Sequence, residues 1–256
     1  MKHKLKYLFI IATLLFNTMV QAAEVDAVLQ WAEQTVLSSP VSGLVSKVYV
    51  DVGARVQKND LLLELDDRPY RFRVTQARKR TTAAQADLGE AKREKQRAVE
   101  LFDRTVLSIR DQDLVEIALA KTRAELAAAS SELRQAELDL EYSRIRAPYA
   151  GVIVGRYVSA GETVVQSQVV QPMLKIVRSG SMAAVALVSE QNAARLSLGV
   201  ALQVGVNGRQ YSGRITQLGY ELQSQEAVNG YQIKVVFDLP DAVQLRQGQR
   251  ASIILR

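Results

Sequence analysis

The sequence predicts an α+β protein that is mostly β, in which a β-sandwich is split by a long antiparallel α-helical coiled-coil hairpin and followed by a small β-barrel domain. Three observations indicate this architecture. A short β-motif is written twice, the long stretch between the copies carries heptad repeats, and the C-terminal part alternates strand-like runs with turn signals. A chain of 256 residues can hold two or three small domains of this kind.

The N-terminal residues 1–22 are predicted to be a secretory signal peptide rather than part of the fold. Three lysines precede an apolar run from Tyr7 to Phe16, and small residues lead to a cleavage site after Ala22. The run is too short to span a bilayer by itself. An uncleaved membrane anchor is the alternative, and a lipid-anchored N-terminus is excluded because no cysteine lies near the cut.

Composition excludes several functions for the exported chain. Without the three signal lysines, 30 basic residues face 27 acidic ones, a net charge of +3, and no basic stretch is interleaved with aromatics, so we expect no nucleic-acid partner. The chain has no cysteine, and its one histidine, His3, lies in the signal. Zinc sites and imidazole- or thiol-based catalysis are therefore excluded. The acid clusters are interpreted as solvated charges, and we expect no catalytic residue, no metal and no cofactor.

The doubled motif occupies the residues before and after the helical stretch. "SPVSGLVSKVYVDVGARV", which begins at Ser39, aligns without a gap with "APYAGVIVGRYVSAGETV", which begins at Ala147. The matched residues are Pro40 and Pro148, Gly43 and Gly151, Tyr49 and Tyr157, Val50 and Val158, Gly53 and Gly161, and Val56 and Val164. Each copy is too small to bury a core alone. We therefore predict that residues 36–67 and 145–178 are two halves of one β-sandwich.

Residues 68–144 are predicted to form the helical hairpin. Pro69 stands where a helix can begin. Apolar or small residues then recur at alternating steps of four and three from Tyr70 to Phe102, and Lys95 fills the one place missing from this series. A second seam runs from Val115 to Leu140 within a helix expected over residues 110–143. The short link between the helices makes them antiparallel neighbours, each about 50 Å long at 1.5 Å per residue.

Residues 179–256 are predicted to form a small β-barrel. Four or more short strands surround one helical segment, expected over residues 190–196. Asn207-Gly208 is a strong signal for a tight β-hairpin turn. Only residues 23–35 separate the predicted signal from the first β-motif.

The doubled motif resembles the lipoyl or biotinyl carrier fold, whose halves carry similar Pro-x-x-Gly and Val-x-x-Gly-x-x-Val signatures. In those carriers a modified lysine occupies the turn between the halves, near the position of Glu64 here. The hairpin replaces that turn, so cofactor carriage is not expected. A lipoyl-like domain split by a hairpin, then a barrel, behind an export signal, resembles the periplasmic adaptor, or membrane fusion protein (HlyD-like), family. "LRQGQRASIIL" is similar to the closing strand of that family's barrel, with Gln247 in place of a proline.

The hairpin tip resembles the RND-type efflux adaptor subgroup more specifically. Members carry an arginine, a leucine four residues on and a serine seven further, which correspond to Arg97, Leu101 and Ser108 here, with Asp113 also as in the family. The resemblance implies that these residues dock onto a TolC-type outer-membrane channel. An N-cap role is the alternative for Ser108, with Asp111 in the place of the usual glutamate.

The resemblance implies a non-enzymatic adaptor of a tripartite efflux pump, located in the periplasm and held at the inner membrane by its partner. Its partners would be an inner-membrane transporter, the outer-membrane channel and further copies of itself in a ring. The family's longer members have a membrane-proximal domain made from both termini. Here only residues 23–35 precede the first motif and the sequence ends at the barrel, so we expect the barrel to contact the transporter. Adaptors of ABC-type exporters or type I secretion systems are the alternative. A carbohydrate-binding protein is disfavoured, because Trp31 is the one tryptophan available for a stacking platform.

Overall fold

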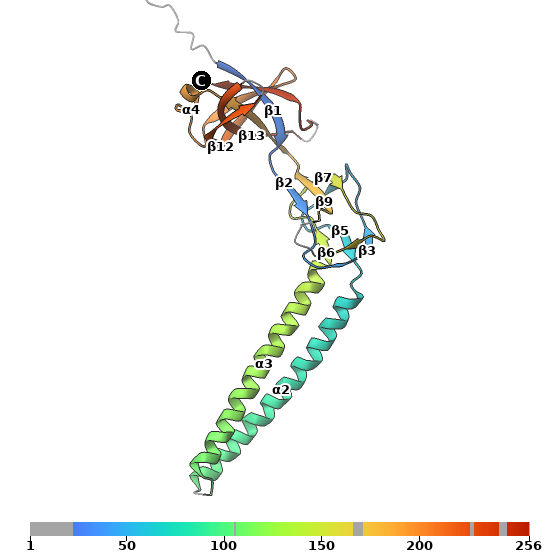
Figure 1. Ribbon diagram of the computed structural model, residues 1–256, viewed down its shortest axis with the longest axis vertical. Helices are drawn as coiled ribbons and strands as arrows, with labels where there is room; N and C mark the ends of the chain where they lie inside the picture. Colours follow the sequence, from blue (N-terminus) through green and yellow to red (C-terminus); the bar gives the residue numbers. More distant parts are fainter. Residues whose placement is uncertain (1–22, 105, 166–170, 226–227, 241–244, 256) are drawn as a thin grey trace, which may run out of the picture. The chain divides into compact units, whose positions relative to one another are not determined.

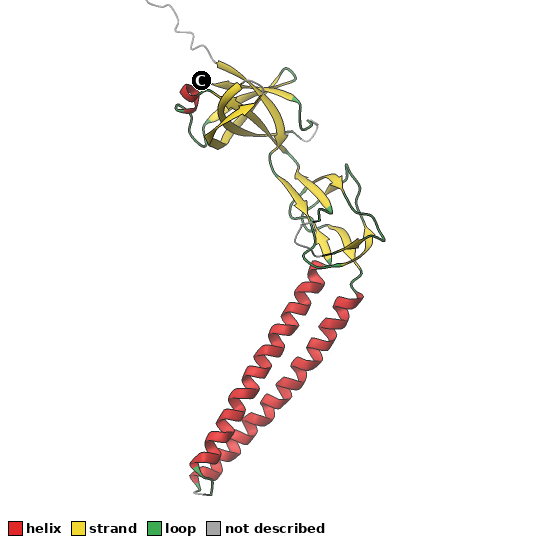
Figure 2. Ribbon diagram, in the orientation of Figure 1, coloured by secondary structure: helices red, strands yellow, loops and turns green. Residues whose placement is uncertain are grey.

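The computed structural model describes residues 23–104, 106–165, 171–225, 228–240 and 245–255. The chain divides into two compact units, residues 34–177 and the barrel unit made by the residues on either side of them. Figures 1 and 2 show the elements of each unit. The predicted signal peptide, residues 1–22, lies outside the described residues, and no helix of the described part is long and apolar enough to cross a membrane.

Each copy of the doubled motif supplies four strands to the first unit. The first copy gives β2 (Gln34–Leu37), β3 (Gly43–Val48), β4 (Arg55–Val56) and β5 (Leu61–Leu65). The second gives β6 (Arg144–Arg146), β7 (Gly151–Arg156), β8 (Thr163–Val164) and β9 (Leu174–Arg178). The matched strands β3 and β7 have equal lengths, as do β4 and β8, so the repeated sequence makes repeated structure.

The two copies exchange their edge strands. The strand orders are β2-β9-β7-β4 in one sheet and β6-β5-β3-β8 in the other, and replacing each strand by its counterpart from the other copy converts one order into the other. The register obeys the same symmetry, because Gly43 pairs with Val164 while Gly151 pairs with Val56. Each copy therefore completes the sheet of the other, which explains why the motif is written twice.

The turns after β3 and β7 also match. Gly53 and Gly161 adopt φ values of +93° and +91°, in the left-handed region that glycine enters without steric cost. The two sheets share one hydrophobic core with residues from both copies, among them Leu62, Leu63, Ile153, Leu174 and Ile176, all fully buried. Burial of this shared apolar surface is the main stabilising term of the domain.

The hairpin consists of α2 (Arg68–Asp103) and α3 (Ile109–Tyr142), within one residue of the predicted bounds. All the predicted seam positions are buried or half-buried, including Lys95. Thr81 Oγ1 donates a hydrogen bond across the seam to the carbonyl oxygen of Ala129 at 3.1 Å. Three ion pairs also join the helices, Arg78–Glu137, Arg80–Glu132 and Lys95–Glu116. The predicted antiparallel coiled coil is confirmed.

The hairpin leaves and re-enters the domain at one place. Strands β5 and β6 are antiparallel neighbours, with Leu63 opposite Ile145, and the Leu65 N–H donates to the Ser143 carbonyl at 2.8 Å. Asp67, the residue before α2, accepts from Arg144 at 3.0 Å, so an ion pair links the start of α2 to β6. The Tyr70 hydroxyl also donates to the Ser42 carbonyl. These contacts fix the base of the hairpin to the sheets.

The second unit is a closed six-stranded barrel. Its strand order is β1-β10-β13-β12-β11-β14, with the bounds given at the end of this paragraph. The helix α4 (Glu190–Ala193) is shorter than the predicted segment of residues 190–196. Asn207 and Gly208 both have positive φ in the turn between β11 and β12, as predicted for a tight hairpin. The strands are β1 (Ala23–Trp31), β10 (Ser181–Val188), β11 (Ala201–Val206), β12 (Arg209–Gln225), β13 (Val228–Asp238) and β14 (Arg250–Leu255).

Strand β1 corrects the prediction that the barrel lies within residues 179–256. Residues 23–31 also belong to the barrel, because β1 pairs with both β10 and β14 and closes it. Ala27 and Leu29 of β1 are buried in the barrel core, and Trp31 packs against it. The alternation of inward and outward residues along β1 is the reason this segment is a strand.

The matched glycines Gly43 and Gly151 differ in the space around them, and this difference can be tested. A Cβ built on Gly151 would lie 2.2 Å from the carbonyl oxygen of Val177, whereas one built on Gly43 would meet Leu65 at an ordinary contact distance of 3.4 Å. We therefore expect Gly151→Ala to destabilise the domain by about 1–3 kcal/mol. Gly43→Ala should be neutral or stabilising by up to about 1 kcal/mol, because alanine fits at this position and lowers the conformational entropy of the unfolded chain. Thermal denaturation followed by circular dichroism measures both, and equal effects would contradict the asymmetry.

Candidate docking site at the hairpin tip

The tip is the segment between the two long helices. Helix α2 ends at Asp103 with Arg104 as its C-cap, and Ser108 is the N-cap of α3. The Val106 N–H donates to the Leu101 carbonyl at 3.0 Å, which folds the chain back over the last turn of α2. The tip is therefore a tight reversal, and its side chains have little of their own chain to pack against.

Apolar side chains are exposed around this reversal. Leu101 is 41% exposed, although its neighbour Phe102 holds the last seam position of α2. Val106 and Ile109 are 71% and 68% exposed. We call Leu101, Val106 and Ile109 the apolar tip residues. Because exposed apolar area is unfavourable in water, their clustering at one end of a rod indicates a contact surface.

Arg97 lies one helical turn before Leu101, on the same face of α2. Its guanidinium is not free, because it donates to Glu94 at 2.5 Å and to Glu90 at 2.8 Å. The hydrogen bonds that Arg97 donates to Glu94 and then to Glu90 raise the pKa of Arg97, and the hydrogen bonds that Glu90 accepts from Arg93 and then from Arg97 lower the pKa of Glu90. Arg97 and Glu90 are thus both charged at neutral pH.

These ion pairs lie in solvent, where water and salt screen the attraction. Exposed pairs of this kind contribute little to stability. Arg97 can therefore leave the carboxylates of Glu90 and Glu94 and bind carbonyl or carboxylate groups of a partner at a small cost in free energy. The planar guanidinium suits such acceptors because it presents several donors in a fixed plane.

Ser108 has a structural role at the start of α3. Its Oγ accepts from the Asp111 N–H at 3.2 Å and donates to Asp111 Oδ2 at 2.6 Å. The N-cap role predicted as the alternative for Ser108 is confirmed. Asp111 also places an acidic side chain in the first turn of α3, where its interaction with the positive end of the helix dipole stabilises the helix. Ser108 is exposed, so its cap role is compatible with a contact to a partner.

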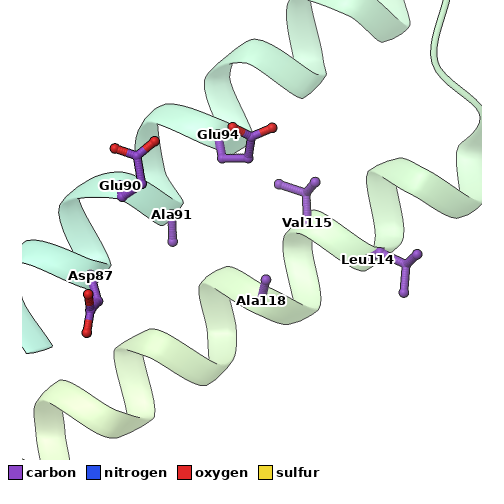
Figure 3. Close-up of a pocket in the computed structure, with 7 residues that line it drawn as sticks. All are labelled: Asp87, Glu90, Ala91, Glu94, Leu114, Val115 and Ala118. Atoms are coloured by element: carbon purple, nitrogen blue, oxygen red, sulfur yellow. The ribbon is translucent and has the colours of Figure 1, made fainter.

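A groove of about 450 Å³ lies between the helices just below the tip. Figure 3 shows Ala91, Val115 and Ala118 directed into the space between α2 and α3, where the small alanine side chains leave it unfilled. Glu90 and Glu94, which hold Arg97, line the same groove. The groove and Arg97 therefore form one continuous face of the hairpin, with acidic groups along α2.

The three predicted site residues all lie at the tip, but on two sides of the reversal. Arg97 and Leu101 share a face of α2, and Ser108 starts α3. Val106, Ile109 and Leu114 are also exposed at or near the tip but were not among the predicted site residues. The sequence could have indicated them, because they are apolar residues that do not occupy seam positions. In the part of the chain that the structure describes, no three His, Cys, Asp or Glu residues are placed to hold a metal ion.

Comparison with known proteins identifies the first unit. Residues 33–173 match the family model of the CzcB-like, barrel-sandwich hybrid domain. The multidrug resistance protein MdtA of Yersinia enterocolitica is 31% identical over 138 residues, which are 52% of this chain and 31% of the relative. MdtA of Pectobacterium carotovorum is 30% identical over 138 residues, 52% of this chain and 33% of that protein. The match thus spans about a third of the length of these relatives.

Solved structures share the fold. A membrane fusion protein of Streptococcus pneumoniae superposes with a TM-score of 0.67 at 16% identity, covering 91% of this chain and 98% of that one. A MacA–MexA chimera that contains the Pseudomonas aeruginosa MexA α-hairpin domain gives 0.64 at 22% identity, covering 91% and 80%. At these identities the likeness concerns the fold alone.

The capping role of Ser108 is tested apart from any partner. Ser108→Ala should cost about 1 kcal/mol of local stability, which corresponds to roughly fivefold faster hydrogen exchange at the amides of the first turn of α3. Ser108→Thr should keep the slow exchange, because threonine is also a good N-cap and its hydroxyl can still donate to the Asp111 carboxylate. Exchange rates unchanged in Ser108→Ala would show that the cap contributes nothing.

Proposed function

Because the chain belongs to the periplasmic adaptor, or membrane fusion protein, family, we propose that it is the adaptor subunit of a tripartite efflux pump. In this role it links an inner-membrane transporter to a TolC-type outer-membrane channel. The observation that carries the proposal is the group of apolar residues exposed at the far end of the coiled coil. Its relatives are multidrug resistance proteins, which supports export as the process.

The proposed mechanism starts from the length of the hairpin. Helices of 36 and 34 residues place the tip about 50 Å from the sheets. The channel covers the apolar tip residues, and each buried leucine or valine side chain contributes about 1.5–3 kcal/mol. Arg97 leaves Glu90 and Glu94 and donates to acceptors on the channel. The adaptor performs no chemistry, and the energy for transport comes from the transporter.

The finer assignments are also proposals. We favour an RND-type transporter, because the spacing of Arg97, Leu101 and Ser108 is similar to that of the RND-type adaptors. The two-sheet domain is interpreted as a lipoyl-like domain of residues 36–67 and 145–178, split by the hairpin of residues 68–144. The mature protein is placed in the periplasm, associated with the inner membrane through the transporter. Several copies assemble side by side as a homo-oligomer.

Substitution of Leu101 tests the tip directly. Leu101→Asp should abolish efflux and crosslinking to the channel, because a carboxylate must then be buried where a leucine was. Expression and helicity should stay unchanged, since Leu101 lies outside the seam. The measurements are drug susceptibility of cells that carry the variant and crosslinking to the channel.

The matched control is Val52→Asp, which places the same charge on a 61% exposed valine in the turn after β3, far from the tip. This variant should retain efflux and crosslinking. The tip assignment is wrong if Leu101→Asp retains both, or if both variants lose them equally.

A further inference from the structure

The groove between α2 and α3 has two unlike walls. Helix α2 supplies three carboxylates and one alanine, and α3 supplies only apolar side chains (Figure 3). Leu114 is 55% exposed and Ala118 is also exposed, so the groove is open to a partner. Such a surface suits an occupant with an apolar body and a positively charged end. The lining residues are Asp87, Glu90, Ala91 and Glu94 of α2 and Leu114, Val115 and Ala118 of α3.

The groove continues the flank of α2 that carries Leu101. Asp87, Glu94 and Leu101 are spaced seven residues apart, so they lie on one side of a helix whose coiled coil repeats every seven residues. At 1.5 Å per residue, Glu94 lies about 10 Å below Leu101 along the helix axis. A partner helix that covers Leu101 and extends two turns toward the base of the hairpin therefore reaches the groove.

Docking of the tip changes the charge balance of this flank. In the free protein, Arg97 donates to both Glu90 and Glu94. Glu90 also pairs with Arg93 at 2.5 Å, but within the described ranges Glu94 has no second ion pair and Asp87 has none. When Arg97 turns to acceptors on the channel, as proposed above, Glu94 joins Asp87 as a carboxylate without a cation. A protein surface that covers these carboxylates without a positive charge would leave them unpaired, which is costly.

We propose that the groove binds a lysine side chain of the outer-membrane channel. The four-carbon stem of the lysine lies over Ala91, Val115 and Ala118, and its ammonium group meets Asp87 and Glu94. Lysine fits because its long stem packs along apolar surface while its charged end stays at a polar edge. An acidic side chain would meet charges of its own sign there. This lysine contact rests on the channel contact proposed above and names the chemical group that the groove recognises.

Zero-length crosslinking tests the contact in cell envelopes that contain the assembled pump. A carbodiimide joins a carboxylate to a lysine amine where the two groups touch. We expect mass spectrometry to identify Asp87 or Glu94 joined to a lysine of the channel. Ala118→Leu should lower the yield of this adduct several-fold, because the larger side chain occupies the floor of the groove. Helix α3 should stay intact, since leucine is a good helix former and position 118 is exposed.

The matched control is Ala118→Ser, which should keep the yield because serine is close to alanine in size. A photoreactive amino acid at Val106 reports separately, in each background, whether the tip is docked. If position 106 crosslinks to the channel but neither carboxylate joins a channel lysine, the groove contact is wrong and the proposed function stands. Equal yields from Ala118→Leu and Ala118→Ser would also overturn the groove contact. Loss of both kinds of crosslink in the natural sequence would reject the channel contact and the groove contact together.

Discussion

The exchange of edge strands between the two copies of the β-motif is the constraint on which the rest of the structure depends. Strands β4 and β8 have only two residues each and find their partners in the opposite copy. Neither copy can complete a sheet or bury a core without the other. The exchange also makes β5 and β6 neighbours, so a long insertion between the copies can leave and return at one place without opening either sheet.

The hairpin is attached to the sheets through these neighbouring strands, β5 and β6. Its inner seam contains many alanines and threonines, which keep the two helices close along their length and limit the apolar area that holds them together. Hydrogen bonds and ion pairs to Ser143, Asp67 and Tyr70 fix the base. The tip, in contrast, exposes apolar side chains that stabilise nothing within the chain. That contrast between a satisfied base and an unsatisfied tip is what favours a docking function over a purely structural one.

The sequence predicted the elements whose signals are periodic and local. The heptads placed both helices within one residue, and Asn207-Gly208 placed a turn. Strand β1 was missed although Ala27, Leu29 and Trp31 alternate inward, because its partner strands β10 and β14 lie more than 150 positions away along the chain. The strand exchange depends on pairing between residues 80 or more positions apart, such as Glu64 with Arg144 and Gly43 with Val164, which no local pattern encodes. The ion pairs of Arg97 and the exposure of Val106 likewise depend on side-chain positions in the folded tip.

In the proposed function, the tip contacts an outer-membrane channel while the sheets do not. Site-specific photocrosslinking in cells tests it most directly, with a photoreactive amino acid at Val106 and, separately, at Val52. Both positions are exposed, at 71% and 61%, so they report contact rather than accessibility. Position 106 should give an adduct that mass spectrometry identifies as the channel, and position 52 should not. Adducts with the channel from position 52 alone, or from neither position, would contradict the account.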